Sequence, residues 1–166
     1  MKKVLIARPL PDVVVAEARK YFDVTVRSET SPLSMSEMQT ALGAFDGIMP
    51  TLGDMFQPAV FDSLSESKCS ILANFGVGYN HIDVDAALQR GITVSNTPGA
   101  VTDATADIAM TLMLMSARRA GEGERLIRSG EWEGWHPTQM LGLHLSGKSV
   151  GIVGMGRIGQ AIAQRC

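Results

Sequence analysis

Short, β-branched apolar segments alternate with segments of helical periodicity along the first 97 residues. This alternation limits the fold strongly, because strand–helix units of this kind build a parallel sheet that is covered by helices. The predicted strands lie at residues 3–7, 23–27, 46–50, 70–75 and 92–96. The predicted helices lie at residues 12–22, 35–43, 58–64 and 83–91. We therefore expect an α/β fold.

The near-regular spacing of these units raises the alternative of a leucine-rich solenoid. That architecture needs a ladder of leucines and asparagines at fixed positions, which these segments lack. Five predicted strands favour an open, flavodoxin-like, doubly wound parallel sheet. The boundary residues agree with this interpretation, since Gly43 and Gly91 occupy positions typical of helix C-caps and Pro58 suits a first helical turn.

The pattern changes after the fifth predicted strand, where Pro98 and Gly99 interrupt the chain. The residues that follow predict one long helix from about 102 to 127, with Thr102 or Asp103 as its N-cap. Its first half is apolar nearly all round, so we expect it to be buried on most faces. Its second half is charged and is expected to reach the surface.

Residues 131–147 contain both tryptophans, Trp132 and Trp135, and have no helical or strand periodicity. They are interpreted as an arm or loop. Two modules result, one at residues 1–97 built around the sheet, and one at residues 98–166 with the long helix, the arm and the first strand–helix unit of a second α/β domain.

The last residues contain the pattern G-x-G-x-x-G, formed by Gly154, Gly156 and Gly159. A predicted strand at 150–152 precedes it and an amphipathic helix follows it, which is the context of a Rossmann dinucleotide-binding turn. Free N–H groups at the start of that helix would attract phosphates. The alternative is a glycine-rich turn without a ligand, and the ribose-binding acid expected about 20 residues later would fall beyond residue 166.

A second glycine turn, Gly76, Val77 and Gly78, follows the predicted strand at 70–75. Ligands bind outside the carboxyl ends of strands in open α/β sheets. Two glycines around a valine leave backbone N–H groups available to a small anion such as a carboxylate. A plain strand–helix turn explains the same residues, so both interpretations stay open at this point.

Other polar residues have simpler explanations than catalysis. Asp83 is expected to cap the helix that follows, and Asp85 to favour its first turn. His81 is expected to be a turn or surface histidine rather than a proton carrier. His136 and His144 have no Cys or carboxylate partners at ligand spacing, so no metal site is predicted.

Composition excludes several classes of protein. The net charge of −2 and the lack of a basic run argue against nucleic acid as a partner. The most apolar stretch, residues 108–115, is too short to cross a membrane, and Arg8 and Pro9 end the N-terminal apolar run too early for a signal peptide. Cys69 and Cys166 are isolated, which favours a reducing, cytoplasmic setting.

Two long stretches, NFGVGYNHIDVDAALQRGITVSNTPGAVTDATADIAMTLML and WHPTQMLGLHLSGKSVGIVGMGRIGQAIA, together resemble the D-isomer-specific 2-hydroxyacid dehydrogenases. The resemblance covers nearly the whole chain and is strongest to glyoxylate and hydroxypyruvate reductases. It implies a flavodoxin-like substrate domain, completed by a returning C-terminal segment, with an inserted Rossmann domain and an active site in the cleft. It also implies the reduction of a small 2-oxo acid to a D-2-hydroxy acid with NAD or NADP as cofactor.

The resemblance also assigns roles to individual residues. The backbone of Val77 and Gly78 would hold the substrate carboxylate, and Thr105 would lie near the nicotinamide. The pyrophosphate-binding turn would consist of Gly154, Gly156, Arg157, Ile158 and Gly159. The long helix and the arm, with Trp132 and Trp135, would form a homodimer interface, with Trp135 as the candidate to reach the partner's active site.

In the family, the arginine, histidine and glutamate of the chemistry follow the glycine fingerprint, so no position of this chain matches them. The resemblance therefore implies no catalytic residue within these 166 residues. The chain is expected to be inactive by itself, as a fragment or as a shortened gene product. Three alternatives remain: a phosphoglycerate dehydrogenase-like enzyme, an NAD(H)-responsive binding protein similar to the C-terminal-binding-protein corepressors, and a domain kept only for dimerisation.

Overall fold

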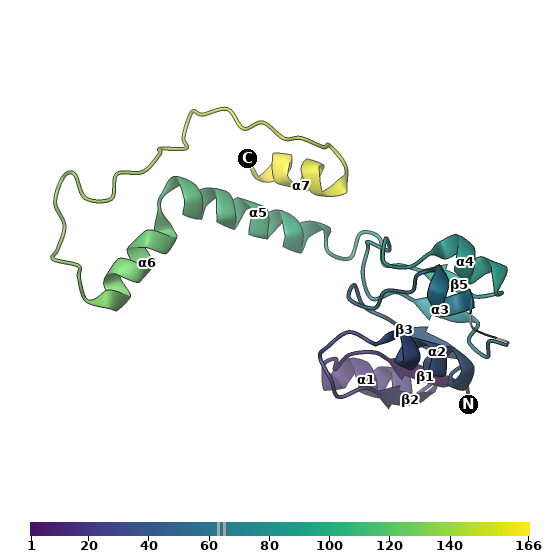
Figure 1. The fold of residues 1–166 in the computed structure, drawn as a ribbon. Coiled ribbons are helices and arrows are strands. Elements are labelled where there is room, and N and C mark those ends of the chain that lie inside the picture. Colours follow the sequence, from purple (N-terminus) through teal and green to yellow (C-terminus); the bar gives the residue numbers. More distant parts are fainter. Residues whose placement is uncertain (63, 65) are drawn as a thin grey trace. The chain divides into compact units, whose positions relative to one another are not determined.

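The computed structural model describes residues 1–62, 64 and 66–166 and divides into two compact units, Met1–Ala100 and Val101–Cys166. The described part of the first unit holds a parallel sheet of five strands in the order β2-β1-β3-β4-β5 (Figure 1). The strands are β1 (Lys3–Ile6), β2 (Asp23–Val26), β3 (Gly47–Met49), β4 (Ile71–Ala73) and β5 (Thr93–Ser95). This order confirms the predicted flavodoxin-like, doubly wound fold.

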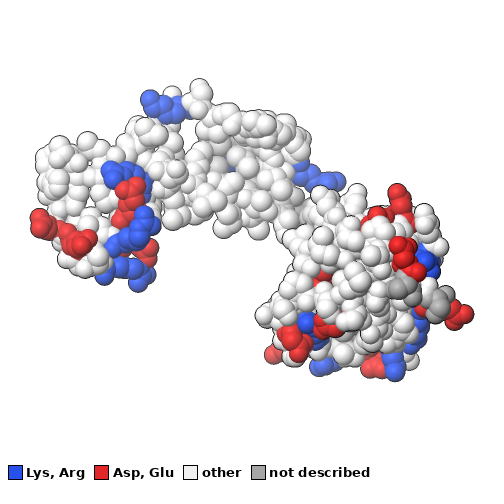
Figure 2. Space-filling view, in the orientation of Figure 1, with Lys and Arg blue, Asp and Glu red and all other residues white. Residues whose placement is uncertain are grey.

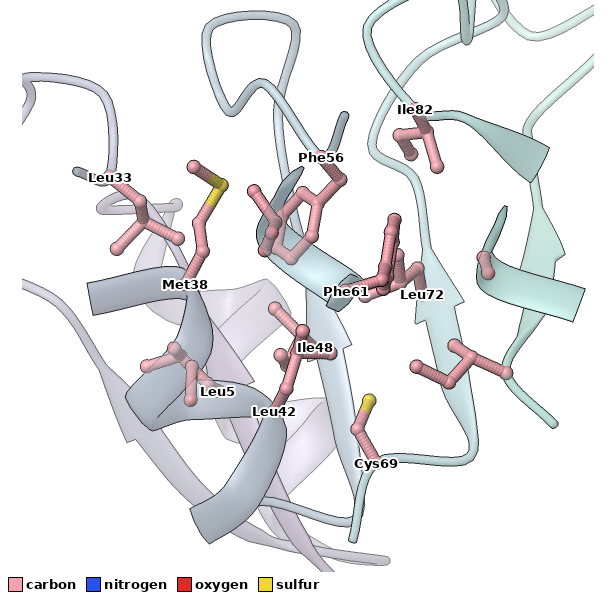
Figure 3. Packing of buried hydrophobic residues seen from close by; sticks show 14 of the residues in the cluster. Leu5, Leu33, Met38, Leu42, Ile48, Phe56, Phe61, Cys69, Leu72 and Ile82 are labelled. Carbon is pink, nitrogen blue, oxygen red and sulfur yellow. The ribbon is translucent and has the colours of Figure 1, made fainter. Parts of the chain in front are cut away.

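Helices connect successive strands of the sheet. They are α1 (Asp12–Arg19), α2 (Met35–Ala44), α3 (Pro58–Asp62) and α4 (Val84–Gln89). The strand order reverses at β1, so right-handed crossovers put α1 on one face of the sheet and α2, α3 and α4 on the other. The main core lies between the sheet and the second set of helices, where Ile48 and Leu72 of the strands meet Leu42 and Phe61 (Figure 3).

The helix boundaries test the predicted caps. Pro58 is the first residue of α3, and Gly91 follows the C-cap of α4 with a φ of 72°, as the sequence predicts. The prediction for Gly43 is wrong, because this residue lies inside α2, which continues to Ala44 and has Phe45 as its C-cap. The extended backbone of Phe45 ends the helix without a left-handed residue, so no glycine is needed there.

A capping box starts α2. The Ser34 side chain accepts a hydrogen bond from the backbone N–H of Glu37, and the Ser34 N–H donates to the Glu37 carboxylate at 2.7 Å. The Arg27 guanidinium also donates to this carboxylate, at 3.0 Å. These contacts, led by the backbone hydrogen bond from Ser34, lower the pKa of Glu37 from 4.5 to about 2.

We expect a pH-dependent contribution of Glu37 to stability. Because the folded-state pKa is the lower one, this contribution is complete above pH 4.5 and is lost as the pH falls toward 2. Glu37→Gln should therefore flatten the decline of the free energy of unfolding in this range, as measured by urea unfolding at several pH values. An NMR titration that gives Glu37 an ordinary carboxyl pKa would contradict the expectation.

The described part of the second unit contains helices but no strand. The helices are α5 (Thr102–Ala117), α6 (Ala120–Ser129) and α7 (Arg157–Arg165). The prediction of a single long helix at about 102–127 is wrong. Arg119 adopts a left-handed conformation with a φ of 56° and separates α5 from α6. Within this unit α7 packs on α5, where Arg165 donates to the carboxylates of Asp103 at 3.1 Å and Asp107 at 2.7 Å.

Two further expectations for α5 are wrong. Its N-cap is Val101, without a side-chain cap, so neither Thr102 nor Asp103 serves that role. The first half is also not buried on most faces, since Ile108 and Leu112 are each 60% exposed. An apolar helix surface is buried only where another element packs against it, and α7 and the arm cover only part of α5. The charged α6 has no buried residue, as predicted.

The predicted strand at 150–152 does not form. A strand depends on hydrogen bonds to a neighbouring strand, and among the described residues no segment pairs with this one. The turn and helix after it are nevertheless present, as Gly154–Gly156 and α7. No helix in the described part of the chain is long and apolar enough to span a membrane.

Candidate functional site

The turn Gly76–Gly78 lies just beyond the carboxyl end of β4, as the sequence predicts. Strand β4 pairs with β3 on one side and β5 on the other, so the turn is at an interior position of the sheet. This is the edge at which open parallel sheets bind ligands.

Two asparagine side chains hold the carbonyl groups of this turn. The Asn74 amide donates to the carbonyls of Gly76 at 3.1 Å and Gly78 at 2.9 Å, and the Asn96 amide donates to the carbonyl of Val77 at 2.8 Å. Asn74 is the residue after β4 and Asn96 the residue after β5, so neighbouring strand ends bring both amides to one place. All three carbonyls of the turn are therefore occupied.

The N–H groups of the turn have a different environment. The N–H groups of Val77 and Gly78 have no acceptor among the described residues of the chain, and both residues are exposed. Two successive donors without a protein acceptor, next to carbonyls that are bound elsewhere, are available to a small anion. The turn therefore suits a small anion.

His81 is a turn residue, which is one of the two predicted alternatives, and not a surface residue. Its side chain is buried, with Nε2 3.0 Å from Oδ1 of Asn74. Burial lowers the pKa of His81, and the negative charge of Asp54 opposes this effect. The histidine therefore contacts the asparagine that holds the turn.

The loop after β3 borders the same turn. Asp54 is fully buried and accepts hydrogen bonds from the Arg8 guanidinium, the Leu33 N–H and the Thr51 N–H, each at 2.8 Å. Leu52 of this loop is exposed, and its Cδ2 lies 4.0 Å from the position that a Cβ atom on Gly78 would occupy. The loop therefore contributes an apolar side chain next to the candidate anion site.

Sequence reasoning missed Asn74, Asn96 and the pair of Arg8 with Asp54. A single asparagine or an isolated aspartate carries no motif. The available signal was position, since Asn74 and Asn96 each lie near the carboxyl end of a predicted strand, at the same edge of the sheet.

The second candidate site is the glycine fingerprint before α7. Gly154 has a φ of 97°, and a Cβ atom on Gly159 would lie 2.1 Å from the Gly154 carbonyl oxygen, so neither position accommodates a side chain without strain. A Cβ atom on Gly156 would meet nothing within 4 Å, which leaves open space at the start of the helix. A turn that is open at Gly156 and leads into the free N–H groups of α7 suits a phosphate.

The remaining predicted site residues lie in the second unit. Thr105 is in the first turn of α5 and its side chain is exposed. Trp135 is 79% exposed, and Trp132, half-exposed, donates from Nε1 to Gln139 at 3.4 Å. His136 and His144 are exposed, and no group of metal-ligating side chains occurs among the residues that the structure describes.

Asp83 and Asp85 have the structural roles that the sequence predicts. The Asp83 carboxylate accepts a hydrogen bond from the Ala86 N–H at 2.8 Å as the N-cap of α4. Asp85 lies in the first turn of the same helix, where a negative charge is favourable. Helix capping and a first-turn position therefore account for both carboxylates.

Comparison with known proteins identifies a family. The model of the D-isomer specific 2-hydroxyacid dehydrogenase catalytic domain matches residues 4–164. A glycerate dehydrogenase of Hyphomicrobium methylovorum is 44% identical over 165 residues, which are 99% of this chain and 51% of that protein. A glyoxylate reductase of Pyrococcus horikoshii is 40% identical over 98% of this chain and 49% of its own length.

Two solved structures also resemble this chain. A putative D-isomer specific 2-hydroxyacid dehydrogenase from Polaromonas sp. has a TM-score of 0.91 at 39% identity, over 99% of this chain and 51% of that one. An NADPH-dependent glyoxylate/hydroxypyruvate reductase from Sinorhizobium meliloti was solved with NADP and malonate. It has a TM-score of 0.76 at 31% identity, over 99% of this chain and 49% of that one. The chain thus spans about half the length of the relatives it matches.

Proposed function

Because the chain belongs to the D-isomer specific 2-hydroxyacid dehydrogenase family, we propose that it is part of an enzyme that reduces a small 2-oxo acid to a D-2-hydroxy acid. The substrate is of the glyoxylate or hydroxypyruvate type, as the names of the glyoxylate reductases and the glycerate dehydrogenase among its relatives suggest. The observation that carries the proposal for this chain is the Gly76–Gly78 turn, with its carbonyls bound and its N–H groups available.

The backbone of Val77 and Gly78 binds the substrate carboxylate in this proposal. Both N–H groups lack a protein acceptor in the described part of the chain, and hydrogen bonds to an ionised acceptor are stronger than those between neutral groups. Leu52, beside Gly78, then contacts the apolar part of a short 2-oxo acid and limits its access to water. The site selects for a carboxylate next to a small group.

NAD or NADP is the proposed cofactor and supplies the hydride for the 2-carbonyl carbon. The residues present fit its pyrophosphate, since Gly154 and Gly159 permit a tight turn and Gly156 leaves open space before α7. Arg157 and Ile158 contribute N–H groups at the helix start, and Thr105 lies near the nicotinamide. Residues 1–97 then form the N-terminal part of the substrate domain, and residues 98–166 begin the cofactor domain.

The carboxylate site can be tested on this chain with oxamate, a small 2-oxo acid analogue that is not reduced. We expect titration with oxamate to shift the backbone amide NMR signals of Val77 and Gly78 more than those elsewhere. Acetamide, which lacks a carboxylate, serves as the matched control and should leave both signals in place. Oxamate shifts that cluster away from the turn, or equal shifts with acetamide, would refute the carboxylate assignment.

We also propose a homodimer in which α5 and the arm with Trp132 and Trp135 form the interface. Ile108 and Leu112 are exposed on α5, and large apolar patches seldom remain exposed on monomers. Figure 2 shows few charged side chains over α5 on the face that is drawn, whereas both signs of charge gather over α6. A symmetric pair is the common outcome for such a surface.

Leu112→Asp should shift this dimer toward monomer, because it would place a charge in the apolar interface. Leu88→Asp on α4 is the matched control, since Leu88 is 55% exposed and lies in the other unit. Sedimentation velocity at micromolar concentration should give a dimer for the wild type and the control and a larger monomer fraction for Leu112→Asp. A monomeric wild type at that concentration would exclude the dimer.

We place the protein in the cytoplasm. Cys69 and Cys166 are both free thiols, Cys166 is exposed, and unpaired cysteines are typical of reducing compartments.

A further inference from the structure

We infer that His81 is a positioning residue for the anion site, because it fixes the side chain of Asn74 and thereby the Gly76–Gly78 turn. The inference rests on the proposed function in one respect, namely that the N–H groups of Val77 and Gly78 bind a substrate carboxylate. His81 itself contacts no ligand in this scheme and acts through Asn74 alone.

The hydrogen bonds determine which end of the Asn74 amide faces the turn. Two carbonyl oxygens, of Gly76 and Gly78, lie 3.1 and 2.9 Å from one end of this amide. Carbonyl oxygens only accept hydrogen bonds, so this end is the NH₂ group. The other end is therefore the oxygen, and it lies 3.0 Å from Nε2 of His81.

The same reasoning determines the tautomer of the histidine. Because the Asn74 oxygen only accepts, Nε2 of His81 carries the hydrogen in this contact. A neutral imidazole has one N–H group, which is then on Nε2. Burial lowers the pKa of His81, so the neutral Nε2–H form is the one that donates to Asn74 at neutral pH.

Loss of this donor would affect the turn specifically. An asparagine amide can rotate so that its oxygen and nitrogen exchange places, and the rotated form would direct an oxygen at the two carbonyls. The Nε2–H of His81 disfavours that rotated form, because an Asn74 NH₂ group would then face the Nε2–H donor. His81 thus adds a third hydrogen bond to the amide orientation that keeps the carbonyls of Gly76 and Gly78 bound.

The position of His81 is fixed from outside the turn. Its carbonyl accepts a hydrogen bond from the Gln57 side chain at 3.1 Å, and the Asp83 N–H donates to the Phe56 carbonyl at 2.8 Å. The backbone on this side of His81 is therefore held by the segment after β3, independently of Asn74. A histidine anchored by another loop is suited to hold a flexible glycine turn in place.

Two substitutions of His81 separate a positioning role from simple packing. His81→Met keeps a similar volume but has no donor, and His81→Gln offers an amide N–H at about the distance of Nε2. We expect His81→Met to raise the oxamate dissociation constant, measured from the Val77 and Gly78 amide signals, by about fivefold to tenfold, the loss of one hydrogen bond. His81→Gln should restore binding to within about twofold of the wild type.

His144→Met is the matched control, since His144 is exposed, belongs to the arm of the second unit and is not a residue of the anion site. It should leave the Gly76 and Gly78 signals and the dissociation constant unchanged. If His81→Met does not fold, ¹⁵N coupling spectra of the wild-type imidazole still decide the tautomer on which the inference depends. A proton on Nδ1 of the neutral ring would overturn the inference.

The inference would equally be overturned if His81→Met binds oxamate with the dissociation constant of the wild type. It would also be overturned if the oxamate dissociation constant of His81→Gln is raised as much as that of His81→Met. Its failure differs from a failure of the proposed function. If oxamate shifts no amide of the wild-type turn, the carboxylate site is wrong. The tautomer and the Gly76 and Gly78 signals of the variants would then still decide whether His81 positions the turn.

Discussion

Asp54→Ala is expected to lower the free energy of unfolding of the first unit by about 3–5 kcal/mol, the usual effect of breaking a buried ion pair. The Asp54 carboxylate is fully buried and contacts Arg8, whose side chain is 12% exposed, at 2.8 Å. It also accepts hydrogen bonds from Leu33 and Thr51, which lie in two different loops. Removal of the carboxylate would leave these donors and the guanidinium without their shared acceptor.

The matched control is Glu17→Ala, which removes an exposed ion pair with Lys20 at 2.6 Å. Exposed pairs contribute only about 0–1 kcal/mol, because solvent screens them and their side chains lose entropy. Urea unfolding followed by circular dichroism gives both values. Equal effects of the two substitutions would show that the buried pair does not stabilise the loops at the carboxyl edge of the sheet.

The second large effect concerns activity. The 166-residue chain by itself is expected to show no steady reduction of glyoxylate or hydroxypyruvate with NADH or NADPH. His81, the histidine next to the anion site, is buried and donates to Asn74, so it is not available to protonate a carbonyl. General acid catalysis contributes about 10²–10⁴-fold to such reactions. Residues 150–152 also form no strand, which leaves the proposed cofactor-binding turn without a sheet behind it among the described residues.

The assay follows the absorbance of the reduced cofactor over time. The glyoxylate reductase of Pyrococcus horikoshii, measured under the same conditions, shows that the assay detects turnover. We expect the rate of this chain to be at least about 100-fold lower than that of the relative, because His81 is engaged with Asn74 and not available as a proton donor. Comparable rates would mean that catalytic groups have been overlooked within these residues.

The sequence by itself determined the features that depend on neighbouring residues. Alternation of strand and helix patterns predicted every strand of the sheet in the first unit, because side-chain periodicity reports which face of an element is buried. The cap at Asp83 and the left-handed Gly91 were also predictable, since a cap acts within a few residues of its helix end. The glycine fingerprint belongs to the same class, because a tight turn depends on local backbone freedom.

Only the tertiary structure decided the features that depend on distant partners. Arg8 and Asp54 are separated by 46 positions, and Asn74 and Asn96 meet at the turn because β4 and β5 are neighbours in the sheet. One side of α5 stays exposed, and the segment at 150–152 forms no strand, because of which elements do or do not pack beside them. The periodicity of a segment does not indicate which other segment will pack against it. The physical reason is that burial and strand pairing belong to pairs of segments, whereas a sequence pattern describes one segment at a time.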